Sequence, residues 1–136
     1  MIMESDIRIL SEYRVPFTPP SPERPLVIRS IDYGGEEHPV TAKRAVVVPV
    51  SRLPLRSDAA IHNVKLLAGP RWTTQLPADS GIGREEEGGE HGYIKISCED
   101  FPEPGMNLKW ISDALDRLVN QANVCYSFSY SARQLR

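Results

Sequence analysis

The sequence has few of the side chains from which metal and catalytic sites are commonly built. Its 136 residues include two cysteines, Cys98 and Cys125, and three histidines. Two cysteines are too few for a disulfide framework and favour a reducing compartment, and no CxxC or HxxxH spacing joins cysteines and histidines into a metal-ligand motif. We therefore expect neither a bound metal nor another cofactor.

Long apolar runs are also lacking. No run approaches the roughly 18 to 20 residues that cross a bilayer, and Glu4 and Asp6 precede the first arginine, unlike the basic start of a signal peptide. The apolar share is only 40%, while 12 prolines and 9 glycines interrupt regular structure. These features predict a soluble chain with one small core, long arms and no membrane span.

What is present begins with an arm. Residues 1–14 have apolar side chains at the spacing of a short helix with one buried face. Five prolines follow between Pro16 and Pro25, and since each fixes φ and removes a backbone donor, this stretch is expected to be extended. We interpret residues 1–25 as an N-terminal helix and proline-rich arm.

Two strands and a helix are predicted next. Residues 26–33 alternate between apolar and polar side chains and residues 45–50 are rich in valine, so both are expected to be strands, paired antiparallel. Ser57 stands at an N-cap position, and an apolar face then runs to Ala68, where Gly69-Pro70 ends the helix.

An acidic, glycine-rich segment separates this helix from the third strand. Residues 73–92 contain five glycines and five acidic residues and are expected to form a flexible, disordered insertion. Residues 93–99 alternate as a half-buried strand does. The side chains expected to face outward are those of Tyr93, Lys95 and Ser97; those expected to face inward are Ile94, Ile96 and Cys98.

The last predicted element is a helix over residues 106–122. It has one apolar stripe, and Lys109 with Asp113 and Asp113 with Arg117 form i,i+4 pairs on its polar side. The tail over residues 123–136 fits either a strand or an extension ordered on a partner.

The order strand-strand-helix-strand-helix predicts an α+β fold. We expect a small two-layer domain in which two helices cover one face of a sheet of about three strands. The domain is assigned to residues 26–122, with the flexible insertion at 73–92 and the C-terminal tail at 123–136. Its core is small for its surface, so a partner surface would help to stabilise it.

The candidate catalytic groups have simpler explanations. Cys98 faces the predicted core, where a cysteine usually packs as a small apolar side chain. Glu99 and Asp100 are adjacent on a strand and point to opposite faces, so they cannot act as a paired acid and base. The glycines near residues 81–83 lead into glutamates that would repel a phosphate. We expect no catalytic site and no small-molecule substrate.

Charge is distributed unevenly, although the net charge is only −2. From Lys43 to Arg71 there are six basic residues and one acidic residue, Asp58. A local excess of this kind is typical of phosphate contacts, and an ordinary solvated face is the alternative. The candidate RNA-binding residues are Lys43, Arg44, Arg52, Arg56, Lys65 and Arg71. Trp72 beside them could stack on a base or fill an edge of the core.

Four blocks of the sequence resemble one known family. They are Tyr13–Pro20, His38-Pro39 before the valine strand, Lys65–Trp72 and Ile94–Phe101, and the similarity continues at Asn107, Trp110 and Leu115–Leu118. Over about residues 10–122 the chain resembles the mitochondrial small-subunit ribosomal proteins numbered thirty-five in animals and twenty-four in yeast.

This resemblance implies a non-enzymatic, structural component of the mitochondrial ribosome in the matrix, located in the head of the small subunit and supporting mitochondrial translation. The implied partners are small-subunit mitochondrial rRNA and other mitochondrial ribosomal proteins. Import into mitochondria implies an arginine-rich transit segment, which residues 1–14 do not resemble, so further residues are expected upstream. The insertion at 73–92 is longer than the turn found in the family.

Two other hypotheses remain open at this point. A non-ribosomal protein-protein adaptor would dock through the small domain and the aromatic tail, and its basic residues would meet acidic proteins. An enzyme that uses Cys98 would need an exposed and ionised thiol.

Overall fold

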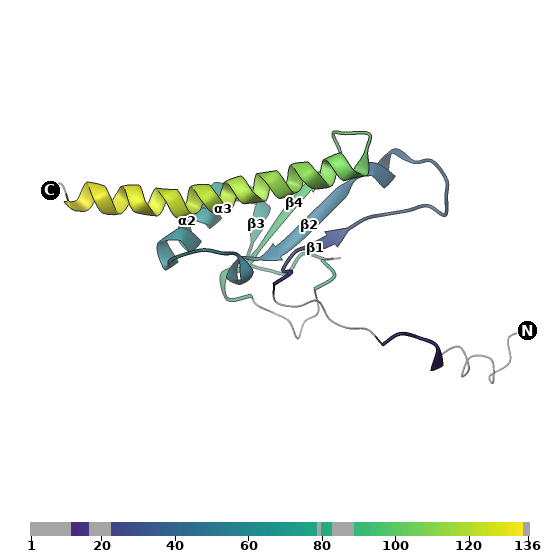
Figure 1. Ribbon diagram of the computed structural model, residues 1–136, viewed down its shortest axis with the longest axis horizontal. Coiled ribbons are helices and arrows are strands. Elements are labelled where there is room, and N and C mark those ends of the chain that lie inside the picture. The colour runs from purple at the N-terminus through teal and green to yellow at the C-terminus, as the bar shows by residue number, and fades with distance from the viewer. Residues whose placement is uncertain (1–11, 17–22, 79, 83–88, 135–136) are drawn as a thin grey trace, which may run out of the picture.

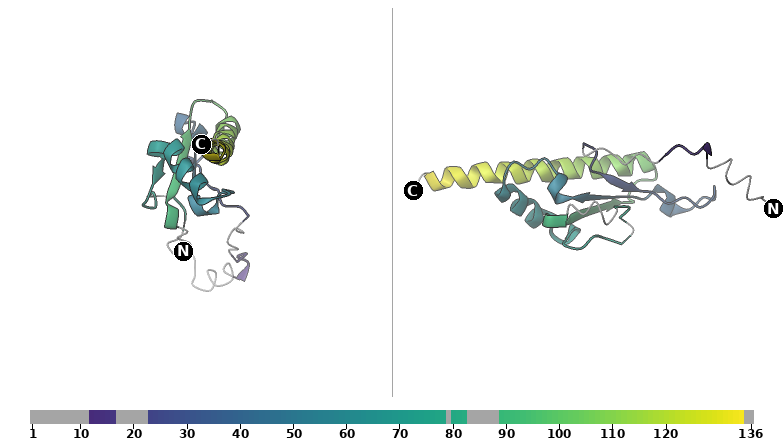
Figure 2. Two further views of the ribbon diagram at one scale, coloured as in Figure 1. Left: turned by 90° about the vertical axis from the view of Figure 1, so that its left-hand side faces the viewer. Right: turned by 90° about the horizontal axis from the view of Figure 1, so that it is seen from below.

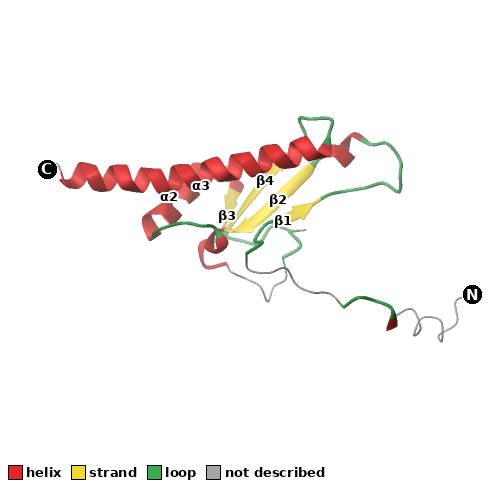
Figure 3. Ribbon diagram, in the orientation of Figure 1, coloured by secondary structure: helices red, strands yellow, loops and turns green. Residues whose placement is uncertain are grey.

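Two helices cover one face of an antiparallel sheet in the computed structural model, which describes residues 12–16, 23–78, 80–82 and 89–134 (Figure 1). The elements in chain order are β1 (Val27–Arg29), β2 (Arg44–Pro49), α2 (Asp58–Ala68), β3 (Trp72–Thr73), β4 (Tyr93–Cys98) and α3 (Pro104–Gln134). Seen end-on in the left panel of Figure 2, α3 lies beside the sheet as a separate layer. The predicted α+β class is confirmed (Figure 3).

The valine-rich strand β2 lies inside the sheet, whose strand order is β1-β2-β4-β3. It pairs antiparallel with β1, where Val27 lies opposite Val47, and with β4, where Val46 lies opposite Ile96. Apolar β-branched residues on both faces suit this internal position. Pro49 is the last residue of β2, where its missing N–H costs the ladder little.

The fourth strand, β3, was not predicted from the sequence. Trp72 and Thr73 pair with Ile94 and Tyr93 at the other side of β4. A two-residue strand has no periodicity to detect, because its place in the sheet depends on a partner strand about twenty residues away. Thr73 belongs to the predicted insertion, of which residue 79 and residues 83–88 lie outside the described residues.

The helix α2 begins and ends where its sequence indicates. The Ser57 hydroxyl oxygen accepts a hydrogen bond from the Ala60 amide at 3.2 Å, as expected of an N-cap. At the other end Gly69 has a φ of 56°, a left-handed conformation that favours glycine.

The helix α3 is much longer than predicted. It begins at Pro104 and continues to Gln134, so the backbone of residues 123–134 is helical and does not form the strand that was one of the two alternatives for the tail. Lys109 and Asp113 form the expected ion pair at 2.9 Å, while Arg117 Nε donates to the backbone carbonyl of Asp113 at 3.2 Å. Residues 1–11 and 17–22, most of the predicted N-terminal helix and arm, lie outside the described residues.

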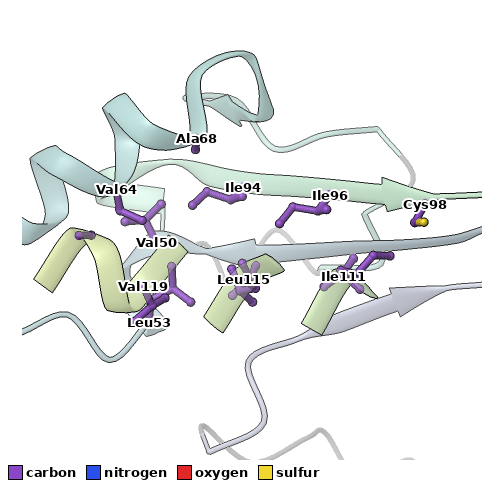
Figure 4. Packing of buried hydrophobic residues seen from close by; sticks show 13 residues of the cluster. Val50, Leu53, Val64, Ala68, Ile94, Ile96, Cys98, Ile111, Leu115 and Val119 are labelled. Atoms are coloured by element: carbon purple, nitrogen blue, oxygen red, sulfur yellow. The ribbon is translucent and has the colours of Figure 1, made fainter. Parts of the chain in front are cut away.

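The core lies between the sheet and the two helices (Figure 4). Its members come from alternate positions of the two central strands, from the chain that follows β2 and from one stripe on each helix. They are Val46, Val48, Val50, Leu53, Val64, Ala68, Ile94, Ile96, Cys98, Ile111, Leu115, Val119 and Ala122. No helix in the described part of the chain has the length and apolar character to cross a membrane.

The opposite, helix-free face of the sheet is covered over only part of its area. Tyr93, Lys95 and Ser97 share this face, as predicted. Lys95 and Ser97 are exposed, whereas the Tyr93 side chain is only 2% exposed, so its expected contact with solvent is not found. A Cβ atom on Gly89 would lie 3.0 Å from the Tyr93 hydroxyl, and one on Gly81 would lie 3.1 Å from Val27. Connecting segments between β3 and β4 therefore pack over this part of the face.

Candidate nucleic-acid interface

Lys43 and Arg44 lie where the short 3-10 helix Pro39–Ala42 leads into β2. The His38 Nδ1 atom accepts a hydrogen bond from the Val40 amide and so begins this turn. The Lys43 ammonium lies 3.4 Å from a carboxylate oxygen of Glu99. One guanidinium nitrogen of Arg44 donates to the backbone carbonyls of Thr41 and Lys43, at 2.7 and 2.9 Å.

Arg52 and Arg56 lie past the other end of β2, in the segment that leads to α2. The Arg56 amide donates to the side-chain oxygen of Asn123 at 3.2 Å, and the side-chain nitrogen of Asn123 donates to the Pro54 carbonyl, also at 3.2 Å. These two bonds hold the segment against α3. The Arg56 side chain is exposed and that of Arg52 is half-buried.

Lys65 and Arg71 lie at the end of α2, next to Trp72. The Lys65 ammonium lies 5.4 Å from the centroid of the Trp72 ring, within the range of a cation-π contact. The Trp72 indole N–H donates to the His91 carbonyl at 2.8 Å, and the half-buried ring packs against the core. Of the two roles considered for Trp72, the structure shows the one at the edge of the core.

The six candidate RNA-binding residues therefore lie in three separate places around the domain. Lys43 and Arg52 flank opposite ends of a six-residue strand, which separates them by roughly 20 Å. The six residues are therefore close in the sequence but not in the folded domain. An interface that used all six would have to reach several sides of the domain.

The structure adds two basic residues that the sequence analysis did not select, Arg29 and Lys95. Both line a hollow of about 220 Å³ on the helix-free face, and Lys43 lines it too. Strand alternation predicted that Lys95 faces outward. It was not grouped with the other basic residues, because it lies far from them in the sequence. The strand register brings Arg29, Lys43 and Lys95 together, because Arg29 and Ser97 both lie opposite Ala45. This register is not visible in the sequence.

The Cys98 thiol lies in the core and is only 4% exposed. Its sulfur lies 3.3 Å from the side-chain oxygen of Asn107, to which the S–H donates. The exposure required for nucleophilic catalysis is therefore not met at Cys98. Within the described ranges no three His, Cys, Asp or Glu side chains come together that could hold a metal ion.

These features define a small two-layer α+β domain with basic residues at several points on its surface. A family model described as "Mitochondrial ribosomal subunit protein" matches residues 16–131. The Small ribosomal subunit protein mS35 of Neurospora crassa is 33% identical over 119 residues, which cover 86% of this chain and 27% of that relative. The chain therefore belongs to this family of mitochondrial ribosomal subunit proteins, which confirms the resemblance, and it spans about a quarter of the relative's length.

Proposed function

We propose that this chain is a structural, non-enzymatic component of the small subunit of the mitochondrial ribosome. It acts in the mitochondrial matrix, in the head of the small subunit, and supports mitochondrial translation by contacting small-subunit rRNA and neighbouring ribosomal proteins. The observation that carries this proposal is the family match, which extends over residues 16–131 and includes both layers of the domain. The name of the similar Neurospora crassa protein, which includes the words "small ribosomal subunit", supports the choice of subunit.

The distribution of charge supports contact with RNA at more than one point. The basic residues proposed to face phosphates are Lys43, Arg44, Arg52, Arg56, Lys65 and Arg71. Because they lie at both ends of β2 and at the end of α2, we expect the domain to sit among several RNA segments. Such an arrangement suits a structural protein, since phosphate contacts fix position and orientation without reading sequence.

Sedimentation of a mitochondrial lysate, with and without ribonuclease, tests this function. The chain is expected to migrate with small-subunit rRNA and to leave that position when the RNA is digested. Migration as a light species in both gradients would contradict the proposal and favour an adaptor outside the ribosome. A known large-subunit protein followed in the same gradients serves as the control for subunit separation.

A further inference from the structure

The helix-free face of the sheet contains two hollows that meet at Lys95 and Ser97. The smaller lies over β1, β2 and β4. The larger, of about 780 Å³, lies toward β3 and is lined by residues 70–78 together with Lys95 and Ser97. Small side chains form the floor here, because Ala45 and Ser97 lie opposite each other on β2 and β4. The result is a depression that crosses the sheet, with longer side chains around it.

The charged side chains that line the two hollows are all basic. Arg29, Lys43 and Lys95 line the smaller hollow, and Arg71 with Lys95 lines the larger one. No Asp or Glu is among the described residues that line either hollow. Glu99 lies beside the smaller hollow, since its carboxylate forms an ion pair with Lys43. Among the residues that the structure describes, the charged lining of this depression is basic, which suits a polyanion.

The aromatic content of this face indicates which part of a nucleic acid would contact it. Sheets that bind single-stranded RNA by its bases present exposed aromatic rings for stacking. The strand residues on this face of β1, β2 and β4 include one aromatic side chain, Tyr93, and it is 2% exposed. At the rim, the Trp72 indole N–H donates to the His91 carbonyl and the Lys65 ammonium lies over the ring, so this ring already has partners within the domain. The face therefore offers charge and hydrogen-bond donors and lacks a stacking platform.

We propose that this helix-free face is a site for the sugar-phosphate backbone of small-subunit rRNA, contacted by Lys43, Lys95 and Arg71 with Arg29 at the β1 side. The proposal rests on the ribosomal function above and deepens it, because it assigns one of the RNA contacts to this face and makes Lys95 its central residue. From β1 to β3 the sheet measures roughly 14 Å, or three inter-strand spacings, which accommodates several phosphates of one strand.

Binding of the chain to a labelled RNA duplex of about 16 base pairs, measured over a series of salt concentrations, tests the site. Lys95→Gln is expected to weaken binding and to lower the slope of log K against log salt by about one unit. Lys95→Arg, which keeps the charge, is expected to retain the slope. Lys109→Gln is the matched control, because it removes the same charge from an exposed residue of α3.

Two further measurements distinguish a phosphate site from a structural effect. Glu99→Gln removes the carboxylate that competes for Lys43, so RNA binding is expected to become tighter, a direction that misfolding would not produce. A second duplex of equal length and different sequence is expected to bind within about threefold, since backbone contacts carry no base information. Equal slopes for Lys95→Gln and Lys109→Gln, or strong discrimination between the duplexes, would overturn the proposal.

The sedimentation experiment separates this proposal from the function on which it rests. If the unaltered chain migrates with the small subunit but Lys95→Gln leaves the salt slope unchanged, the assigned face is wrong and the ribosomal function stands. If the unaltered chain is a light species with and without ribonuclease, both proposals are wrong.

Discussion

At the residue scale, Asn107 is a buried polar residue whose side chain joins several segments of the domain. Its side chain is fully buried, and its nitrogen donates to the carbonyls of Ala42 and Phe101 at 2.7 and 2.9 Å. Its oxygen accepts from the Phe101 amide at 3.0 Å and from the Cys98 thiol at 3.3 Å. A satisfied amide in a low-dielectric interior fixes the relative positions of the segments that it joins.

Replacing Asn107 with alanine is therefore expected to lower the free energy of unfolding by about 3 kcal/mol, because buried backbone groups at Ala42 and Phe101 lose their partners. Urea unfolding measures the change. Asn120→Ala on the exposed side of the same helix is the control and is expected to shift the free energy by less than about 0.5 kcal/mol. Similar values for the two variants would contradict the assigned role of Asn107.

Gly92 gives a second prediction at this scale. It has a φ of 80°, and a Cβ atom there would lie 2.5 Å from the Thr73 carbonyl oxygen and 2.7 Å from the Trp72 indole nitrogen. Gly92→Ala is expected to cost about 3 kcal/mol, from backbone strain and from displacement of β3. Gly34→Ala is the control, because Gly34 also has a positive φ, of 61°, but has open space around it, so this variant measures the backbone strain alone. If Gly34→Ala cost as much in urea unfolding, the close contact at Gly92 would be unimportant.

The roles of some residues could be predicted from their neighbours in the sequence, and the roles of others could not. Ser57 was identified as a cap because a cap needs only a hydroxyl before an apolar helical pattern. Tyr93 was expected to meet solvent because alternation reports the face of a strand and not the segment that later packs on it. The hydrogen bond from Asn107 to Ala42 joins residues 65 positions apart in the sequence, and no local pattern reports it.

At the scale of elements, the two helices are placed by their apolar stripes. Leu115 lies in the stripe of α3 and is 6% exposed, in contact with the core shared by α2 and the sheet. Leu115→Ala is expected to destabilise the domain by about 2 to 5 kcal/mol, through lost burial and the cavity left behind. The neighbouring exposed Asp116→Ala is the control in urea unfolding. A loss below about 0.5 kcal/mol for Leu115→Ala would mean that the packing face is misassigned.

The elements were predictable where local pattern and tertiary packing agree. The bounds of α2 follow from a cap, an apolar face and a glycine, all adjacent in sequence. The extension of α3 to Gln134 was not predictable, since serines and aromatic residues after Asn123 favour strand as much as helix. A packed helix can add further turns without a new nucleation step, which explains why the helix continues there.

At the scale of the whole molecule, the candidate site was predictable in part. The excess of basic residues between Lys43 and Arg71 is visible in the sequence. Their division among three places is not visible in the sequence, because β2 separates Lys43 from Arg52, and α2 separates Arg56 from Arg71. The depression around Lys95 depends on the register of three strands, so it could be recognised only after folding.

The basic pair at the end of α2 gives the prediction at this scale. Removing the charges of Lys65 and Arg71 is expected to weaken RNA association and to lower its salt slope by about one unit for each lost phosphate contact. The Arg71 side chain is exposed and lines the larger hollow, whereas the Lys65 ammonium lies over Trp72. The same salt titration measures both single variants. An unchanged slope would remove both residues from the RNA interface.

The length of α3 has a geometric consequence for assembly. The helix has 31 residues and, at 1.5 Å per residue, measures about 46 Å. Among the residues whose side chains are described, Ala122 is its last core residue, and Figures 1 and 2 show the helix continuing past α2. Because each residue turns a helix by about 100°, one residue inserted after Val124 would rotate the part of the helix beyond it relative to the domain. The length of the helix therefore sets the distance between the sheet and the far end of α3, and its helical phase sets the direction in which the side chains at that end point.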